Sequence, residues 1–240
     1  MAVKNVDRFV LFDWYRNGDE VLFEKNMDFF TLPQAGQIRQ TKVAIIGVGA
    51  LGQMVAHQLV RSGFEQLILV DKDVLEYSNF NRQLYATDST VGRSKVEVLK
   101  AGLLDIHPQI DITTYETFLN GNNGKELVSE ADIVVDCVDD METKVYLEKL
   151  MDELNIPLVH GAVEGWYGQV TTIFPGDRVL EQLYMHRKEQ KVTALMPTVS
   201  AVAALQVGEV IKFATGSREL LHRKVLFVDM LNSDFSWVAM

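Results

Sequence analysis

Cysteine is nearly absent from this sequence. Cys137 is the only cysteine among 240 residues, so the chain cannot form an internal disulfide or build a zinc site from several cysteines. Proteins without disulfides are typical of a reducing compartment, and we expect a cytoplasmic location. We also expect no zinc.

The sequence contains no long hydrophobic run either. The longest apolar stretches, such as VAIIGVGALG and LILV, are shorter than the roughly 18 to 20 residues that cross a bilayer. Residues 1–20 carry charges throughout and lack the apolar segment of a signal peptide. We therefore expect no membrane partner.

Positive charge is scarce as well. The chain has 23 Lys and Arg residues against 33 Asp and Glu residues, which gives a net charge of −10. Generic nucleic-acid binding requires Lys and Arg that displace counterions from phosphates, so we expect no nucleic-acid partner. A local basic pocket for a nucleotide is compatible with this balance, and an acidic surface favours a basic protein partner.

What the sequence does contain is a regular alternation of strand-like and helix-like segments. KVAIIGV at 42–48 is an apolar strand that runs into the glycine-rich turn GVGALG at 47–52. A segment with helical spacing, QMVAHQLVRSG, is followed by a second apolar strand, QLILVD at 66–71. This order is that of a β-turn-α-β unit in a parallel sheet.

The alternation continues to residue 175. The pattern predicts helices at 94–104, 125–131 and 141–155, and strands at 110–117, 132–140, 157–163 and 168–175. We therefore predict an α/β fold of the doubly wound, Rossmann-like type, with a mostly parallel sheet and helices on both faces.

No repeat, low-complexity tract or linker divides the chain, so we expect a single domain over residues 1–240. Its predicted parts are a helical N-terminal extension (1–40), a nucleotide-binding core (41–175), a mobile loop (177–196), and a C-terminal helix followed by antiparallel strands (197–240). The loop prediction rests on residues 177–193, which are polar and lack clear periodicity. Such a loop could fold over a site.

The glycine-rich turn predicts nucleotide binding. Gly47, Gly49 and Gly52 stand between a strand and a helix in the pattern GxGxxG. This pattern permits a tight turn and lets a phosphate approach the backbone N–H groups at the helix N-terminus. Asp71 closes the next strand, where an acidic residue can hold a ribose hydroxyl. These features alone are compatible with NAD, FAD or ATP.

The stretch VDKDVLEYSNFNRQLY at 70–85 favours ATP. Arg82 can pair with phosphate oxygens in a bidentate manner, and Asn79 and Gln83 add amide donors. Lys95, at the start of the next helix, supplies a second cation. Each is commonly a surface or turn residue when taken singly, but together they suit a triphosphate better than the neutral, flat slot that nicotinamide needs. An oxidoreductase is therefore a distant alternative.

The sequence DCVDD at 136–140 supplies a candidate metal ligand. Asp139 and Asp140 follow an apolar strand, at the edge where open α/β sheets bind ligands. A carboxylate there can hold Mg²⁺ against phosphate. One of the two can instead cap the helix that begins near Met141. The residues alone do not decide which aspartate has which role.

A set of ordered motifs runs through the chain: GVGALG, DKDVLEYSNFNRQLY, VGRSKVE, HPQI, DCVDDMETK, HGAVEGWYGQVTTIFPG and LQVGEVIK. This set resembles the ThiF/MoeB/HesA adenylyltransferases, which are relatives of the ubiquitin-activating enzymes. The resemblance covers roughly residues 40–240.

The resemblance implies ATP-dependent adenylation of the C-terminal glycine carboxylate of a small ubiquitin-fold protein ending in Gly-Gly, often a sulfur carrier. By position, the glycines at 47–52 would bind phosphate, Asp71 the ribose, and Asp139 the Mg²⁺. The residues around the triphosphate would be Asn79, Arg82, Gln83 and Lys95. Family members are generally homodimers. Adenylation of a peptide or a small carboxylate is an alternative.

Two positions depart from the family pattern. Lys25 stands where an arginine that reaches into the neighbouring subunit's site is usual, so this role is weakened or passes to Arg16 or Arg39. Asp140 stands where Asn is usual, which adds negative charge beside the expected metal. These departures raise a second hypothesis, a weakly active homologue or regulatory subunit, which the intact set of catalytic residues opposes.

The cysteine chemistry of the family is also missing. Many relatives bind a structural zinc through two CxxC pairs, one of them in the loop after FPG, and this loop has no cysteine here. Cys137 lies inside an apolar strand, where a cysteine is mostly a packing residue. We therefore expect the reaction to stop at the acyl-adenylate.

The remaining candidates have ordinary interpretations. His57 and His107 are expected to pack or to cap helices, and His186 and His222 to lie at the surface. His160 ends a strand on the ligand side, so contact with substrate is a minor alternative. The last pair, Trp166 and Tyr167, either lines a path for a flexible glycine tail or covers the sheet edge.

Overall fold

One sheet organises the molecule. The computed structural model describes residues 23, 25–26, 28–185 and 193–240, and in this part of the chain eight strands pair in the order β3-β2-β1-β4-β5-β6-β7-β8. The parallel strands are β1 (Lys42–Ile46), β2 (Gln66–Val70), β3 (Asp111–Tyr115), β4 (Ile133–Asp136) and β5 (Leu158–Glu164). The antiparallel strands that extend the sheet are β6 (Tyr167–Ile173), β7 (Lys224–Asp229) and β8 (Asp234–Ala239).

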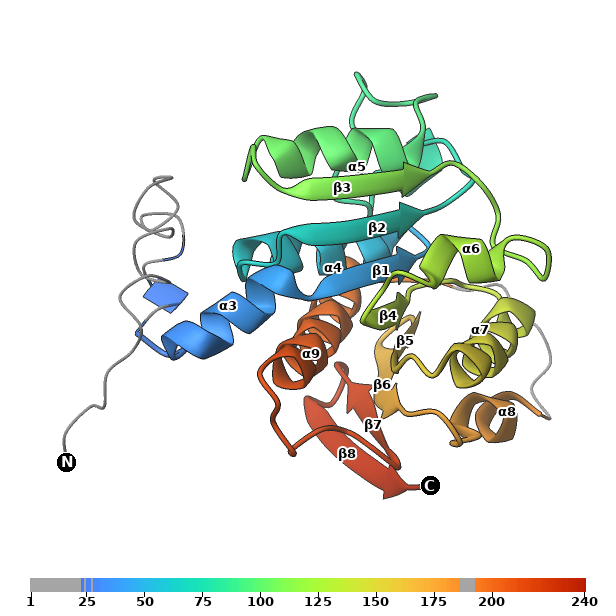
Figure 1. Ribbon diagram of the computed structural model, residues 1–240. Coiled ribbons are helices and arrows are strands. Elements are labelled where there is room, and N and C mark those ends of the chain that lie inside the picture. Colours follow the sequence, from blue (N-terminus) through green and yellow to red (C-terminus); the bar gives the residue numbers. More distant parts are fainter. Residues whose placement is uncertain (1–22, 24, 27, 186–192) are drawn as a thin grey trace.

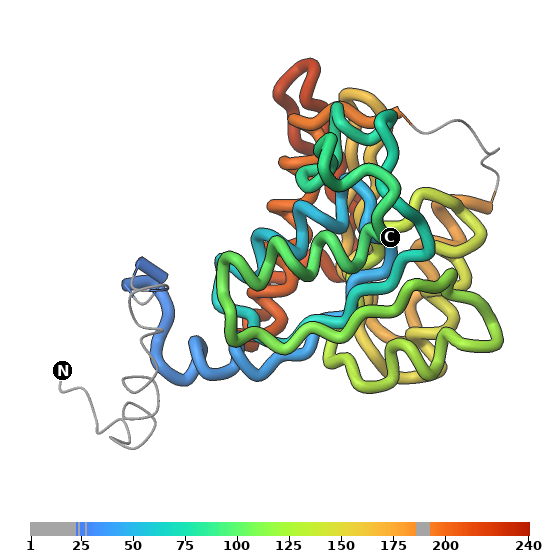
Figure 2. The backbone as a smooth tube through the Cα atoms, turned by 90° about the horizontal axis from the view of Figure 1, so that it is seen from above, coloured from blue at the N-terminus to red at the C-terminus, as the bar shows by residue number. Residues whose placement is uncertain are grey.

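Helices cover both faces of this sheet (Figure 1). The helices on one face are α4 (Ala50–Arg61), α5 (Lys95–Leu104) and α9 (Met196–Ala214). Those on the other are α6 (Gly124–Val128), α7 (Met141–Leu154) and α8 (Val179–Tyr184). Before β1, α3 (Leu32–Gln40) lies at the edge of the sheet where the parallel strands begin (Figures 1 and 2).

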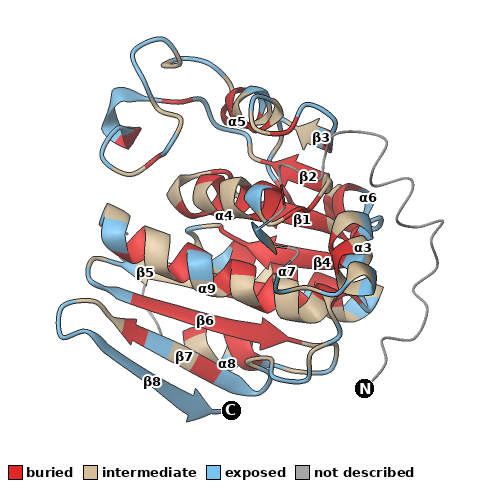
Figure 3. Ribbon diagram, turned by 90° about the vertical axis from the view of Figure 1, so that its left-hand side faces the viewer, coloured by how far each residue is buried: buried red, intermediate tan, exposed pale blue. Residues whose placement is uncertain are grey.

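The two helical layers explain why the central strands are apolar throughout. In β1, Val43 and Ile45 belong to the cluster that includes α4 and α9, whereas Ala44 and Ile46 belong to the cluster that includes α7. Burial of a valine or isoleucine side chain contributes about 1.5–3 kcal/mol, so a strand covered on both sides needs apolar residues at every position. Figure 3 shows the contrast with the edge strand β8, in which every residue is exposed.

The connections around β1 and β4 create a crevice. These strands are neighbours in the sheet, but the chain leaves β1 for α4 on one face and leaves β4 for α7 on the other. Ligands of open α/β sheets bind at such a point, beyond the carboxyl ends of the strands. The predicted glycine-rich turn follows β1, and the predicted aspartates follow β4. The topology therefore brings both to one edge of the sheet.

The predicted fold class is confirmed, including the terminal antiparallel strands. The prediction of a loop over 177–196 is wrong at Val179–Tyr184, which form α8. This helix is too short to show a period in the sequence, and it depends on Glu148 of α7, whose carboxylate accepts hydrogen bonds from the N–H groups of Leu180 and Glu181. Residues 186–192 lie outside the described part of the chain. Among the described residues no helix is long and apolar enough to span a membrane.

Candidate functional site

A cavity of about 1520 Å³ opens at the carboxyl ends of the parallel strands. The predicted site residues that line it are Gly47, Gly49, Asp71, Asn79, Arg82, Gln83, Lys95, Asp139 and Asp140. Gly52 and Lys25 are not among the lining residues. The fold therefore brings most of the predicted site residues together at one cavity.

The glycine-rich turn is shaped by contacts that exclude side chains. Gly47 has a φ of +88°, and a Cβ there would lie 2.7 Å from the carbonyl oxygen of Cys137. At Gly52 a Cβ would lie 1.9 Å from the carbonyl oxygen of Gly47. Gly52 thus lets helix α4 start close against the turn, whereas Gly47 and Gly49 are the glycines that face the cavity.

Asp71 ties the turn after β1 to the end of β2. Its Oδ2 accepts a hydrogen bond from the N–H of Val48 at 2.6 Å, and its Oδ1 accepts one from the N–H of Asp73 at 2.8 Å. Burial raises the pKa of Asp71, and the nearby charge of Lys95 opposes this shift. The carboxylate lines the cavity beside the turn, which is the position a ribose ligand requires.

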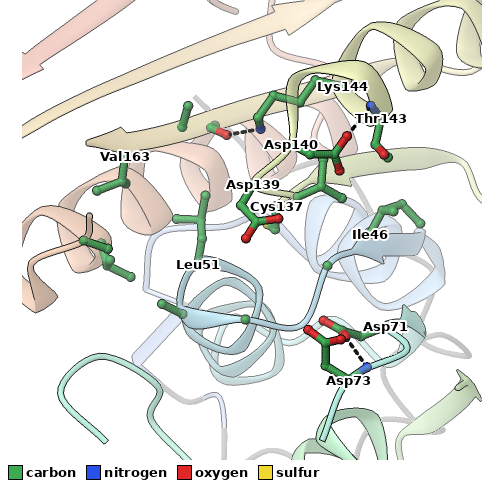
Figure 4. A pocket seen from close by; sticks show the side chains of 18 of the residues that line it. Ile46, Leu51, Asp71, Asp73, Cys137, Asp139, Asp140, Thr143, Lys144 and Val163 are labelled. Atoms are coloured by element: carbon green, nitrogen blue, oxygen red, sulfur yellow. Dashed lines mark hydrogen bonds between the residues drawn. The ribbon is translucent and has the colours of Figure 1, made fainter. Parts of the chain in front are cut away.

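Lys95 has a partner that sequence reasoning missed. Its Nζ lies 2.9 Å from Oδ2 of Asp73, and the two side chains are 9% and 52% exposed. Both residues line the cavity, and Figure 4 shows Asp73 beside Asp71. The D-x-D spacing of these aspartates was the signal that could have identified Asp73.

The short helix η1 (Tyr77–Asn79) ends with Asn79. Arg82 and Gln83 lie on the segment that follows it. Arg82 donates from Nη1 to the carbonyl of Ser78 at 2.9 Å. Asn79 is buried, and its Oδ1 accepts a hydrogen bond from the N–H of Glu76. Gln83 accepts a hydrogen bond from Gln53 of α4 at 3.2 Å. Arg82 is the most exposed of the three, while the two amides already shape the segment that presents it.

The two aspartates after β4 have different roles. Asp140 caps α7, since its Oδ1 accepts the N–H of Thr143 at 2.7 Å. The carboxylate of Asp139 instead points into the cavity, across from Asp71 and Asp73 (Figure 4). Of the two aspartates, Asp140 is therefore the cap, and Asp139 faces the cavity.

Asp139 fits a magnesium ion that is shared with phosphate. Within the described residues, no group of three or more His, Cys, Asp or Glu side chains could hold a metal by itself. Mg²⁺ commonly binds through one or two carboxylates together with phosphate oxygens and water. The carboxylate of Asp139 is exposed and lines the cavity, so it is one such donor.

A comparison with known protein families assigns the chain to one of them. The ThiF family model matches residues 23–240. The chain belongs to the ThiF family. It is 30% identical over 210 residues to the SAMP-activating enzyme E1 of Haloferax volcanii, which covers 85% of this chain and 78% of that protein. It is also 30% identical over 205 residues to the molybdopterin-synthase adenylyltransferase of Escherichia coli, with 82% of each chain covered.

Solved structures show the same fold. The crystal structure of Escherichia coli MccB with ATP has a TM-score of 0.80 at 23% sequence identity, and it covers 97% of this chain and 76% of that one. Together with the names of the relatives, the family match confirms the predicted family and the prediction of an adenylyltransferase.

A buried polar network in this ThiF-family chain was not anticipated. Asp136, the last residue of β4, pairs with Lys144 of α7 at 3.0 Å and with His160 of β5 at 2.6 Å. Burial, together with Lys144, lowers the pKa of His160. Burial alone would raise the pKa of Asp136, but Lys144 and His160 hold it below its ordinary value. His160 is fully buried and is not a lining residue of the cavity, so the alternative of direct substrate contact is wrong here.

Cys137 is a packing residue, as predicted. It is buried, and burial raises the pKa of its thiol far above the ordinary value. Its Sγ lies 4.0 Å from Oε1 of Gln206 on α9. A thiol that stays protonated is a poor nucleophile.

Lys25 and Arg39 are not among the residues that line the cavity. Lys25 is exposed. Arg39 pairs with Glu65 at 2.9 Å, and Arg16 lies outside the described residues. Both Trp166 and Tyr167 are exposed, and of the two only Tyr167 lines the cavity.

The other histidines have structural partners. His57 contacts Tyr85 and Arg61, and His107 is buried beside Glu65. His222 lies 3.0 Å from Asp177 near the surface, and His186 is outside the described residues.

Proposed function

We propose that this chain uses ATP and Mg²⁺ to adenylate the C-terminal glycine carboxylate of a small ubiquitin-fold protein ending in Gly-Gly, with release of pyrophosphate. The names of the two relatives, a SAMP-activating enzyme and a molybdopterin-synthase adenylyltransferase, support this proposal. The observation that carries it is the arrangement of Asp139, Arg82 and Lys95 around one cavity that adjoins the glycine-rich turn.

The nucleotide occupies the half of the cavity between the glycine-rich turn and Lys95. Backbone N–H groups at the start of α4 face the phosphates, and Asp71 accepts a hydrogen bond from the ribose. Arg82 pairs with phosphate oxygens, with the side chains of Asn79 and Gln83 as supporting donors. Lys95 turns from Asp73 toward the triphosphate, since Asp73 is half exposed and water can replace the lysine as its partner.

The second substrate occupies the half formed by β5, β6 and the start of α9. Here Gly165 donates a backbone hydrogen bond to the carbonyl of Thr193 at 2.8 Å, and a Cβ at Gly168 would lie 2.3 Å from Val202. Tyr167 lines the same side. The Gly168–Val202 distance reflects close packing of β6 against α9. A tail of glycines, which carries no side chains, is suited to the part of the cavity that Tyr167 and Gly168 line.

The reaction needs no general base, because the glycine carboxylate is already ionised at neutral pH. One of its oxygens forms a bond to the α-phosphorus. The bond from this phosphorus to the oxygen that bridges to the β-phosphate breaks, and pyrophosphate leaves with the electron pair. Arg82 and Lys95 offset the negative charge that gathers in the transition state. When bound at Asp139, Mg²⁺ supplies further neutralisation of the phosphate oxygens.

We further propose a homodimer in the cytoplasm. The neighbouring residue Asn26 donates to the carbonyl of Arg61 at the end of α4, whereas the start of that helix lines the cavity. Lys25 can therefore assist catalysis only in the site of a neighbouring subunit. As a lysine it provides a point charge rather than the bidentate fork of an arginine. The whole chain acts as one functional domain.

The test is ATP–pyrophosphate exchange with purified protein, Mg²⁺ and a panel of ubiquitin-fold proteins, each intact and with its Gly-Gly tail removed. Exchange that depends on one intact tail supports the proposal and identifies the carrier. Asp139→Asn is expected to abolish exchange, while the matched variant Asp140→Asn keeps a good helix cap and is expected to remain active. Tight ATP binding without exchange for any carrier would instead favour a regulatory homologue or a peptide substrate.

A further inference from the structure

The buried carboxylate of Asp136 holds the turn that carries Asp139. Its Oδ1 accepts the N–H of Val138 at 3.1 Å, so one contact lies inside the turn itself. The same carboxylate accepts hydrogen bonds from Lys144 at 3.0 and 3.2 Å and lies 2.6 Å from Nδ1 of His160. This carboxylate is fully buried, and it fixes the start of the turn.

Lys144 holds the other end of the same turn. It lies on α7, which begins directly after Asp140, and its Nζ also donates to the carbonyl of Gly161 on β5 at 3.1 Å (Figure 4). The ammonium group therefore joins β4, α7 and β5. Because Asp139 lies between Asp136 and Lys144 in the chain, the turn that presents its carboxylate is held at both ends.

The network continues from His160 to helix α8. Since Nδ1 of His160 faces the carboxylate of Asp136, its Nε2 is the acceptor on the other side. Nε2 lies 3.0 Å from Nε2 of Gln169 and 3.3 Å from the hydroxyl of Tyr184. Gln169 and Tyr184 are lining residues of the cavity, and Tyr184 is the last residue of α8. The network thus runs from the Asp139 turn to Gln169 and Tyr184 in the wall of the cavity.

We infer that Lys144 and His160 are positioning residues, which hold the Asp139 turn and α8 in the arrangement that the adenylation step requires. The inference rests on the proposed function. A buried ion pair adds little stability over an apolar contact of the same size, so stability alone does not explain this network. A fully satisfied polar network nevertheless fixes one geometry, and here that geometry is the placement of a metal-holding carboxylate.

The test compares three variants of the full chain, Lys144→Met, His160→Gln and Tyr184→Phe, with Lys144→Arg as the conservative variant. Lys149→Met is the control, since Lys149 lies on the same helix, is half exposed and pairs only loosely with Glu181 at 3.7 Å. All are assayed at a temperature at which thermal unfolding shows them fully folded. If Lys144→Met does not fold, the inference is tested on His160→Gln and Tyr184→Phe, which remove no buried charge from the network.

For Lys144→Met we expect the kcat of exchange to fall roughly 100-fold, the loss that a misplacement of about 1 Å can cause. The KM for ATP should change little, and the Mg²⁺ concentration for half-maximal exchange should rise. The effects of His160→Gln and Tyr184→Phe should be smaller and in the same direction, and Lys144→Arg should restore most of the activity. A wild-type kcat and Mg²⁺ dependence in all three variants would overturn the inference.

Failure of the proposed function is recognised separately. If the wild-type protein shows no exchange with any carrier, the readout becomes the affinity for ATP, measured by calorimetry with and without Mg²⁺. A Mg²⁺ enhancement that is present in the wild type and lost in Lys144→Met supports the positioning role. An enhancement equal in both proteins, or absent from the wild type, contradicts it.

Discussion

Two aspartate–lysine pairs, each with its lysine in the lining of the same cavity, differ mainly in their access to water. Asp73 and Lys95 are 2.9 Å apart, and the aspartate is half exposed. Asp136 and Lys144 are 3.0 Å apart, and their side chains are at most 4% exposed. An ion pair in contact with water exchanges partners at little cost, whereas a buried pair does not. The first pair is therefore suited to release a cation to a ligand, and the second to hold a fold in place.

The two pairs should differ most in how much the free energy of unfolding falls when their lysine is removed. Lys144→Met leaves Asp136 charged and buried, so we expect the free energy of unfolding to fall by about 3–5 kcal/mol. Lys95→Met leaves Asp73 in contact with water, and a loss below about 1 kcal/mol is expected. Urea unfolding at neutral pH measures both values, and similar losses would contradict the distinction.

Catalysis should show a strong dependence on the exposed pair. Lys95→Ala removes a cation that faces the triphosphate, and we expect the kcat of pyrophosphate exchange to fall about 100- to 1000-fold. Lys100→Ala, on the same helix and outside the cavity lining, is the control and should keep its activity. A Lys95→Ala variant with near-normal exchange would remove Lys95 from the site.

Asp73 competes with phosphate for Lys95, and this competition can be removed. In Asp73→Asn we expect ATP to bind about 5-fold more tightly, which corresponds to an ion-pair contribution of about 1 kcal/mol. Asp88→Asn removes an exposed charge outside the cavity lining and should leave the affinity unchanged. The measurement is calorimetry at two salt concentrations, and weaker binding in Asp73→Asn would mean that Asp73 itself helps to hold the nucleotide.

The buried pair should also respond to pH through His160. Because its pKa is lowered in the folded protein, the unfolded state binds more protons once the pH falls below about 6.5, the ordinary value for histidine. Stability contributed by neutral His160 is therefore present above that pH and is lost as the pH falls. The difference in unfolding free energy between wild type and His160→Gln should narrow from pH 7.5 to 5.5, and a constant difference would refute the assignment.

The site residues that could be predicted stand next to recognisable ends of strands in the sequence. Asp71 and Asp139 each follow an apolar strand, and parallel topology brings the carboxyl ends of such strands to one edge. The choice of Asp139 over Asp140 needed the observed hydrogen bond from the N–H of Thr143 to Asp140, since either aspartate could have capped the helix.

The network around Asp136 could not be predicted in the same way. Asp136 and His160 meet because they are register partners in the pairing of β4 with β5, and sequence alone does not give a register. The histidine inside the apolar stretch PLVHGAV was the available signal. Helix α8 was missed because its contacts with Glu148 and His160 come from distant elements rather than from its own periodicity.

The cavity is lined by residues at the ends of β1 and β2, after the end of β4, in β5 and in the first turn of α5. A molecule that fills it therefore acts as a non-covalent cross-link between both halves of the sheet. By mass action, a ligand present at 100 times its dissociation constant adds about 2.7 kcal/mol to the free energy of unfolding. The melting temperature of this protein should accordingly report how much of the site is occupied, whatever the turnover of the enzyme.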